Sequence, residues 1–168
     1  NLLLSLFHLK EELSMRQVKT DQSEMKDYHL DHLRIDINRV YMTGWSAGGY
    51  LSIVYAVDFP EKIAAIVPIS SGVDTQTQDL PSHFCDVEQV PVWLFHGTSD
   101  EVVPFVYSIQ AYNAVVDRCS PRVLPKLSLL MNARHHMHHI IYDLSALDGG
   151  TIDEVTIEYD PRYDAYNQ

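Results

Sequence analysis

Short apolar runs alternate with longer amphipathic stretches from residue 36 onward. Runs of β-branched, aromatic and aliphatic side chains predict strands over residues 40–43, 64–69, 92–96 and 126–131. The stretches between them predict helices over residues 47–57 and 106–117. Strands that are apolar throughout and are separated by helices favour a parallel sheet buried on both faces. The pattern therefore predicts an α/β fold with a doubly wound, mostly parallel sheet.

The two ends of the chain and one connection follow this pattern less closely. Leucines at near-helical spacing predict an amphipathic helix over residues 2–13, followed by helix or loop over residues 14–26. The polar connection over residues 71–89 could cover a substrate or be an ordinary surface loop. After His139 we expect a helix through Ala146 and then a short edge strand around residues 155–159. We expect one domain over residues 1–168, in which residues 1–35 are an atypical N-terminal segment.

The charge balance argues against two classes of partner. The 168 residues include 12 Lys and Arg against 23 Asp and Glu, which gives a formal net charge of −11. Clustered basic side chains bind nucleic acids and anionic membrane surfaces, so we expect neither as a partner. No apolar stretch approaches the roughly 20 residues that span a bilayer, so we expect a soluble protein, whose compartment the sequence does not fix.

The two cysteines, Cys85 and Cys119, are too few for a disulfide framework or a zinc site. They could form a single disulfide. Free buried thiols are the default expectation, because unpaired cysteine is among the most buried residue types.

Candidate chemistry begins at the sequence Gly44-Trp45-Ser46-Ala47-Gly48, between a predicted strand and a predicted helix. A serine hydroxyl is a poor nucleophile unless it stands clear of its backbone, near a base and near N–H donors. A sharp strand-to-helix turn provides this arrangement and leaves no room for side chains two positions either side of the serine, where Gly44 and Gly48 lie. We predict Ser46 as a nucleophile on such an elbow. The alternative is a glycine-rich turn with a capping serine.

Two further loops follow predicted strands and hold candidate partners for Ser46. Asp100 follows the strand over residues 92–96, and four histidines follow the last predicted strand: His135, His136, His138 and His139. Functional residues collect at the carboxyl ends of strands in open α/β sheets. We choose His135 as the base because it lies just beyond the strand, with His136 in reserve and the other two expected on the following helix. As alternatives, Asp100 could cap a turn, and the histidines could bind a metal, although no carboxylate lies among them.

Residues 36–49, which contain the elbow, and residues 92–100, which contain His96-Gly97-Thr98-Ser99-Asp100, resemble the α/β-hydrolase family. More narrowly, they resemble the esterases that include feruloyl esterases and polyhydroxybutyrate-depolymerase-like enzymes. The resemblance covers roughly residues 33–145 and implies Ser46 as nucleophile, Asp100 as acid and one of the four histidines as base. It further implies hydrolysis of a small-molecule carboxylic ester through an acyl-enzyme, without a cofactor.

Two neighbours of Ser46 complete the expected site. The Ala47 N–H at the helix start is the expected oxyanion donor, and Trp45 could line the substrate pocket or pack in the core. This chain departs from the family at Arg134, where a glycine usually precedes the catalytic histidine, and it lacks an upstream His-Gly-Gly segment that donates a second N–H. We therefore expect either a truncated chain, or a homo-oligomer or complementing chain that completes the sheet. A hydrolase-like scaffold that binds a partner without catalysis is the alternative function.

Overall fold

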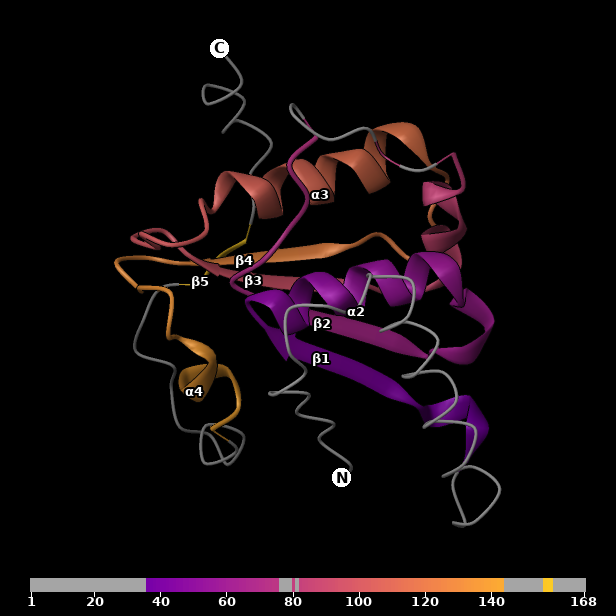
Figure 1. Cartoon of the computed structure of the whole chain (residues 1–168), viewed down its shortest axis with the longest axis horizontal. Coiled ribbons are helices and arrows are strands. Elements are labelled where there is room, and N and C mark those ends of the chain that lie inside the picture. Colours follow the sequence, from indigo (N-terminus) through magenta and orange to yellow (C-terminus); the bar gives the residue numbers. More distant parts are fainter. Residues whose placement is uncertain (1–35, 76–79, 81, 144–155, 159–168) are drawn as a thin grey trace, which may run out of the picture.

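A five-stranded sheet forms the centre of the computed structural model, which describes residues 36–75, 80, 82–143 and 156–158 (Figure 1). Its strands are β1 (Tyr41–Trp45), β2 (Ala65–Ile69), β3 (Trp93–Gly97), β4 (Lys126–Leu130) and β5 (Thr156–Glu158). They follow one another across the sheet in chain order, with β1 to β4 parallel and β5 antiparallel at the edge beside β4. The predicted parallel sheet is confirmed, and its first four strands start within one residue of their predicted positions.

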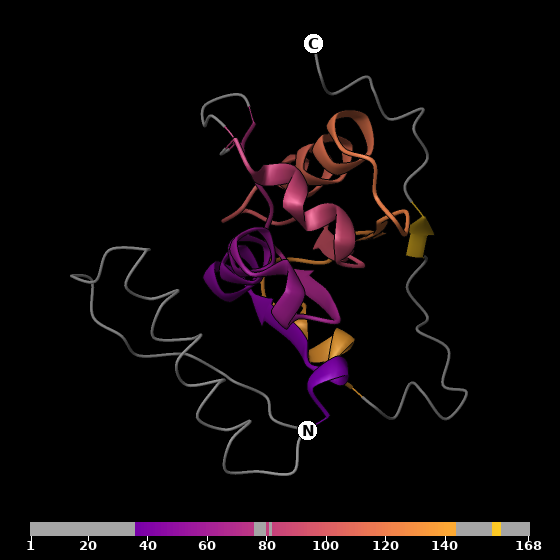
Figure 2. The same cartoon turned by 90° about the vertical axis from the view of Figure 1, so that its right-hand side faces the viewer.

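Helices cover both faces of the sheet (Figures 1 and 2). The two long helices, α2 (Ala47–Asp58) and α3 (Val106–Arg118), and the 3-10 helix η3 (Phe84–Gln89) pack on one face, and the short helix α4 (His138–Ile141) packs on the other. Successive strand residues serve opposite faces, because Leu94 joins the α2 and α3 core while Phe95 joins the α4 core. Two short 3-10 helices, η1 (Ile37–Arg39) and η2 (Pro60–Lys62), precede β1 and β2. This is the predicted α/β architecture.

The register of the parallel strands brings three loops to one edge of the sheet. Trp45, the last residue of β1, pairs with Ile69 of β2, and Ile69 in turn pairs with Phe95 of β3. The last residues of β3 and β4, Gly97 and Leu130, also pair with each other. The segments that follow β1, β2, β3 and β4 therefore leave the sheet side by side, which is where open α/β sheets place their functional residues.

Several expectations for the chain ends differ from the structure or fall outside its described part. The helix expected after His139 begins at His138 and ends at Ile141, and Tyr142 beyond it is held by a hydrogen bond between its hydroxyl and Thr43 Oγ1 (2.8 Å). The helix expected over residues 2–13 and the stretch over residues 14–26 lie outside the described residues. Among the helices that are described, none has the length and apolar character that crossing a membrane requires.

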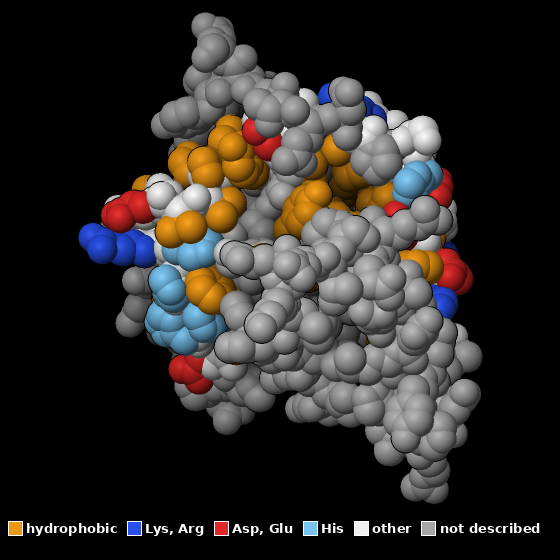
Figure 3. All heavy atoms as spheres, viewed as in Figure 1, with side chains coloured by type: hydrophobic (Ala, Val, Ile, Leu, Met, Phe, Trp, Pro, Cys, Tyr) orange, Lys and Arg blue, Asp and Glu red, His pale blue; other side chains and the backbone are white. Residues whose placement is uncertain are grey.

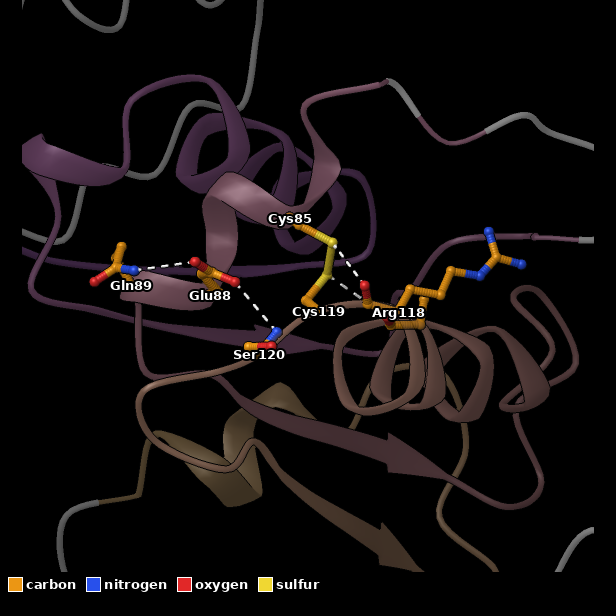
Figure 4. The surroundings of a disulfide bond; sticks show 7 residues. Cys85, Glu88, Gln89, Arg118, Cys119 and Ser120 are labelled. Carbon is orange, nitrogen blue, oxygen red and sulfur yellow. Dashed lines mark hydrogen bonds between the residues drawn. A yellow bond between two sulfur atoms is a disulfide. The ribbon is translucent and has the colours of Figure 1, made fainter.

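The expectation of two free thiols is wrong, because Cys85 and Cys119 form a disulfide across 34 positions of the chain (Figure 4). The bond joins η3 to the residue that follows α3. Glu88 of η3 strengthens the same junction: its carboxylate accepts a hydrogen bond from the Ser120 N–H (3.2 Å), and its backbone carbonyl accepts one from the Arg122 N–H (2.9 Å). The pairing depends on where η3 packs, which cysteine spacing alone does not reveal.

Candidate active site

Ser46 occupies the sharp turn between β1 and α2. Its φ of 56° and ψ of −121° place a non-glycine residue in a sparsely populated backbone conformation. The Ser46 N–H is held by the Ile69 carbonyl (2.9 Å), which extends the β1 and β2 pairing into the turn. The strained geometry is that of the predicted nucleophile elbow.

Only one of the two glycine positions predicted to have no room for a side chain is crowded in the structure. A Cβ at Gly44 would collide with the backbone of Gly48, so strand and helix approach as closely there as predicted. A Cβ at Gly48 would meet nothing within 4 Å, and the prediction of a close approach at Gly48 is therefore wrong. The second crowded position is Gly49, where a Cβ would collide with Ser71 Oγ and lie 2.9 Å from the Gly44 carbonyl oxygen.

The structure brings Ser46, His135 and Asp100 together in a continuous chain of hydrogen bonds. His135 Nε2 lies 3.0 Å from Ser46 Oγ, and His135 Nδ1 lies 2.8 Å from Asp100 Oδ2. An ionised carboxylate only accepts hydrogen bonds, so Nδ1 carries a proton. In the neutral ring, Nε2 then presents its lone pair to the serine hydroxyl. His138 and His139 lie on α4, as expected, and it is His135 whose ring lies between Ser46 and Asp100.

The Asp100 side chain is fully buried and its carboxylate is surrounded by donors. Oδ1 accepts hydrogen bonds from the backbone N–H groups of Val102 and Val103 (both 2.9 Å), and Oδ2 accepts from His135 and from His96 Nε2 (3.1 Å). Burial raises the pKa of Asp100, but the hydrogen bonds from His96, His135 and the two backbone groups outweigh burial and hold that pKa well below its usual range. Asp100 is therefore ionised at neutral pH.

His135 is also fixed through its backbone. The Trp45 indole Nε1–H and the Ser70 hydroxyl both donate to the His135 carbonyl oxygen, at 2.7 and 3.0 Å. Ser70 follows β2 with a φ of 48°, and its own N–H donates to the Phe95 carbonyl (2.8 Å). The contribution of Ser70 was not foreseen from the sequence, where it is simply a serine after a strand. Neither sequence interpretation of Trp45 included this hydrogen bond.

The remaining histidines, His136, His138 and His139, lie close to one another and are here called the histidine patch. Figure 3 shows histidine side chains gathered on this face of the molecule. The rings of His136 and His138 lie 4.9 and 4.7 Å from that of Trp45, and His139 Nδ1 donates to the His136 carbonyl (2.6 Å). Burial lowers the pKa of His138, and the neighbouring histidines lower it further. Within the described part of the chain, no three or more His, Cys, Asp or Glu side chains are placed to hold a metal ion.

Two other predicted positions lie at the border of the site. Ala47 is the exposed first residue of α2, so its N–H has no acceptor within the helix, and its role as oxyanion donor stays a prediction. Arg134, which stands where the family usually has glycine, directs its guanidinium outward, 4.0 Å from the exposed carboxylate of Glu101.

A parallel sheet with Ser46, Asp100 and His135 on three of its carboxyl-end loops defines an α/β hydrolase. The sequence model of the phospholipase/carboxylesterase family matches residues 6–141. The chain belongs to this family.

Individual relatives agree with this placement. The chain is 26% identical over 87 residues to acyl-protein thioesterase 1 of Cryptococcus neoformans var. neoformans, a match that covers 52% of this chain and 37% of that protein. The solved structure of a thermostable esterase is 26% identical, with a TM-score of 0.56, over 80% of this chain and 33% of that one. A putative dienelactone hydrolase from Klebsiella pneumoniae, 20% identical with a TM-score of 0.62 over 85% and 64% of the chains, shares the fold. The chain spans well under half the length of the curated relative.

Proposed function

We propose that this protein is a serine hydrolase that cleaves carboxylic esters through an acyl-enzyme. The observation that carries the proposal is the position of His135, 3.0 Å from Ser46 Oγ and 2.8 Å from Asp100 Oδ2. A neutral imidazole held in this tautomer can take the serine proton as Oγ attacks an ester carbonyl carbon. The Asp100 carboxylate stabilises the imidazolium that forms, and the Ala47 N–H faces the developing oxyanion.

The remaining steps follow from the same groups. The imidazolium of His135 returns its proton to the departing alcohol oxygen, which leaves the acyl group on Ser46 Oγ. A water molecule then loses its proton to His135 Nε2 and attacks the acyl carbonyl, and the acid product leaves as Ser46 regains its proton. The cycle consumes one water and uses no cofactor.

Oxygen esters come first and thioesters second among the proposed substrates. The family description and the esterase structure support oxygen esters, while the curated relatives are named acyl-protein thioesterases. The narrower resemblance to feruloyl esterases and polyhydroxybutyrate-depolymerase-like enzymes makes small aryl and hydroxyacid esters the first compounds to compare. The two substrate classes differ only in the leaving atom, so the same residues would serve both.

We propose a small-molecule substrate and no nucleic-acid or membrane partner, because the net charge of −11 disfavours polyanionic surfaces. We further propose that a second copy or a complementing chain pairs with β1. Within the described residues β1 pairs only with β2, and Tyr41 on β1 is 64% exposed. An unpaired edge strand favours such addition. Light scattering should show association, and a clean monomer at high concentration would contradict it.

A fluorophosphonate probe tests the nucleophile directly, because it modifies only a serine that has been activated by a base. We expect the wild-type chain to be labelled at Ser46, Ser46→Ala to lose the label, and Ser120→Ala, at an exposed serine beside the disulfide, to keep it. Hydrolysis of p-nitrophenyl acetate and of an acyl thioester, measured on the same samples, ranks the two substrate classes. Label that survives in Ser46→Ala contradicts the assignment. A folded wild type that takes no label favours the binding scaffold.

A further inference from the structure

A second buried histidine touches the carboxylate of the site. His96 lies near the carboxyl end of β3 with no exposed surface, on the face of the sheet that carries α3. Its Nε2 lies 3.1 Å from Asp100 Oδ2 and 3.0 Å from the Val103 carbonyl oxygen. Its Nδ1 lies 2.7 Å from the hydroxyl of Ser108, a fully buried residue of α3. Every polar atom of this ring therefore has a partner.

The partners determine where the protons of His96 lie. Both groups near Nε2, a carboxylate and a backbone carbonyl, can only accept hydrogen bonds, so Nε2 must carry a proton. The Ser108 hydroxyl donates its single proton to the Ser71 carbonyl oxygen. The Ser108 oxygen can then only accept from Nδ1, which must carry a proton as well. A ring with protons on both nitrogens is an imidazolium with a charge of +1.

Charge balance supports the same conclusion. Asp100 is ionised and fully buried, and a buried charge is costly unless a partner neutralises it. The groups that face His96 are Asp100 on the adjoining loop, Ser108 on α3 and the backbone carbonyl of Val103. The nearby charged side chains of Glu101 and Arg134 are 75% and 79% exposed and engage each other. The proposed mechanism requires a neutral His135 ring before Ser46 reacts, which leaves His96 to balance the carboxylate.

We propose that His96 is a protonated positioning residue, which holds Asp100 in place and neutralises its charge. As far as it concerns catalysis, the proposal rests on the proposed hydrolase function. His96 fixes Oδ2 at the point where it meets His135 Nδ1. Its positive charge also limits how strongly Asp100 stabilises protonated His135, so that the catalytic proton is returned readily to the leaving group.

The protonation of His96 can be measured without any activity. Nitrogen-15 NMR of the histidine-labelled full chain, at a pH of about 8, probes a condition in which an ordinary histidine, with a pKa of about 6.5, is neutral. We expect one ring with protons on both nitrogens, whose signals disappear in His96→Gln. In Ser108→Ala the Nδ1 proton has lost its acceptor, and we expect only the Nε2 proton to remain. A single protonated nitrogen on His96 in the wild type overturns the proposal.

Two substitutions separate the charge of His96 from its hydrogen bond. Glutamine places a neutral donor near the Nε2 position, facing Asp100, whereas asparagine reaches only the Nδ1 position, facing Ser108. We expect His96→Gln to lower kcat/KM about 10-fold and His96→Asn about 100-fold, since a displaced carboxylate misplaces the base. In His96→Gln the acidic limb of the pH profile should also move to higher pH, because loss of the positive charge favours protonated His135.

A folded His96→Gln protein with an unchanged pH profile contradicts the proposal. A residue that only supports the structure would leave the acidic limb in place, whereas loss of a positive charge near His135 would move it. Thermal unfolding of both variants identifies any that fail to fold. If the wild type neither hydrolyses esters nor reacts with the probe, the proposed function fails, and the NMR result alone still decides the charge of His96.

Discussion

The loops after β3 and β4 hold the acid and the base of the site in opposite ways. In the acid loop, Asp100 is held through its side chain: four donors surround a carboxylate with no exposed surface. In the base loop, His135 is held largely through its backbone carbonyl, by donors from Trp45 and Ser70, and the residues after it form the partly exposed histidine patch. The acid therefore depends on buried charge, and the base depends on backbone position.

This difference predicts how each region responds to substitution. Changes in the acid loop should alter protonation and pH dependence, because they change which charges and protons surround a buried carboxylate. Changes behind the base loop should alter the distance from His135 to Ser46 while leaving the protonation of the ring as it is. The following substitutions are ordered from the largest expected effect to the smallest.

Asp100→Asn should cause the largest loss of activity, about 10,000-fold in kcat, because an amide that donates to Nδ1 would force the wrong tautomer on His135. Ester hydrolysis and near-ultraviolet circular dichroism measure activity and folding on the same samples. Asp117→Asn, at an exposed acid near the end of α3, is the matched control and should keep full activity. Activity of the Asp100 variant within 10-fold of wild type would mean that His135 does not depend on this carboxylate.

We expect the turn that carries Ser46 to accept an alanine at Gly48 but not at Gly44. Gly44→Ala should lower the free energy of unfolding by about 3 kcal/mol or prevent folding, because its Cβ would collide with the Gly48 backbone. Gly48→Ala meets open space inside α2 and should instead raise stability by up to about 1 kcal/mol through helix propensity. Urea unfolding compares the two variants. Equal stabilities would mean that strand and helix are farther apart than the structure shows.

Trp45→Phe and Ser70→Ala each remove one donor from the His135 carbonyl and should each lower kcat about 10-fold by loosening the base. The acidic limb of the pH profile should stay in place, in contrast to His96→Gln. Trp93→Phe removes an indole hydrogen bond to Ser128, at the far end of β3, and is the matched control. A pH profile that shifts in Trp45→Phe would show that the two loops do not differ in the way described.

The two regions should also lose stability at different pH values. The pKa of His138 is lowered in the folded protein, so the unfolded chain binds that proton first, and stability falls as pH drops below about 6.5. The pKa of Asp100 is lowered as well, which places its loss of stability below about pH 4. His138→Gln should reduce the pH dependence of the unfolding free energy only in the upper of the two pH ranges, as measured by urea unfolding, while Ser120→Ala, at an exposed residue that does not titrate, serves as control. If the unfolding free energy of His138→Gln depended on pH above pH 5 as strongly as that of the wild type, the result would contradict this prediction.

Local sequence signals were sufficient for the framework of the site. Apolar runs of strand length located the sheet, and the glycine before Ser46 marked a turn where backbone atoms approach closely. His135 could be selected because a base must follow the last parallel strand before the next helix carries the chain away. Even so, the second glycine that leaves no room for a side chain is Gly49 rather than Gly48, since the register at the start of a helix depends on how that helix packs.

Contacts between distant elements account for what the sequence did not reveal. The role of His96 depends on Ser108 from α3 and on the Ser71 carbonyl, which lie far from it in the chain. The position of His96 near the end of a buried strand therefore did not indicate its contact with Asp100. The disulfide likewise depends on η3 packing beside the end of α3. Such groupings are set by tertiary packing, on which propensity and periodicity carry little information.

The Cys85–Cys119 bond closes a covalent ring around one half of the site. The ring contains β3, the acid loop and α3, and hence His96, Asp100 and Ser108 together. A protease that cut the chain at one point inside this ring would leave both pieces joined, and they would separate only after reduction. In the oxidising compartments where disulfides persist, the segments that carry His96, Asp100 and Ser108 would thus stay covalently linked after a break in the backbone between them.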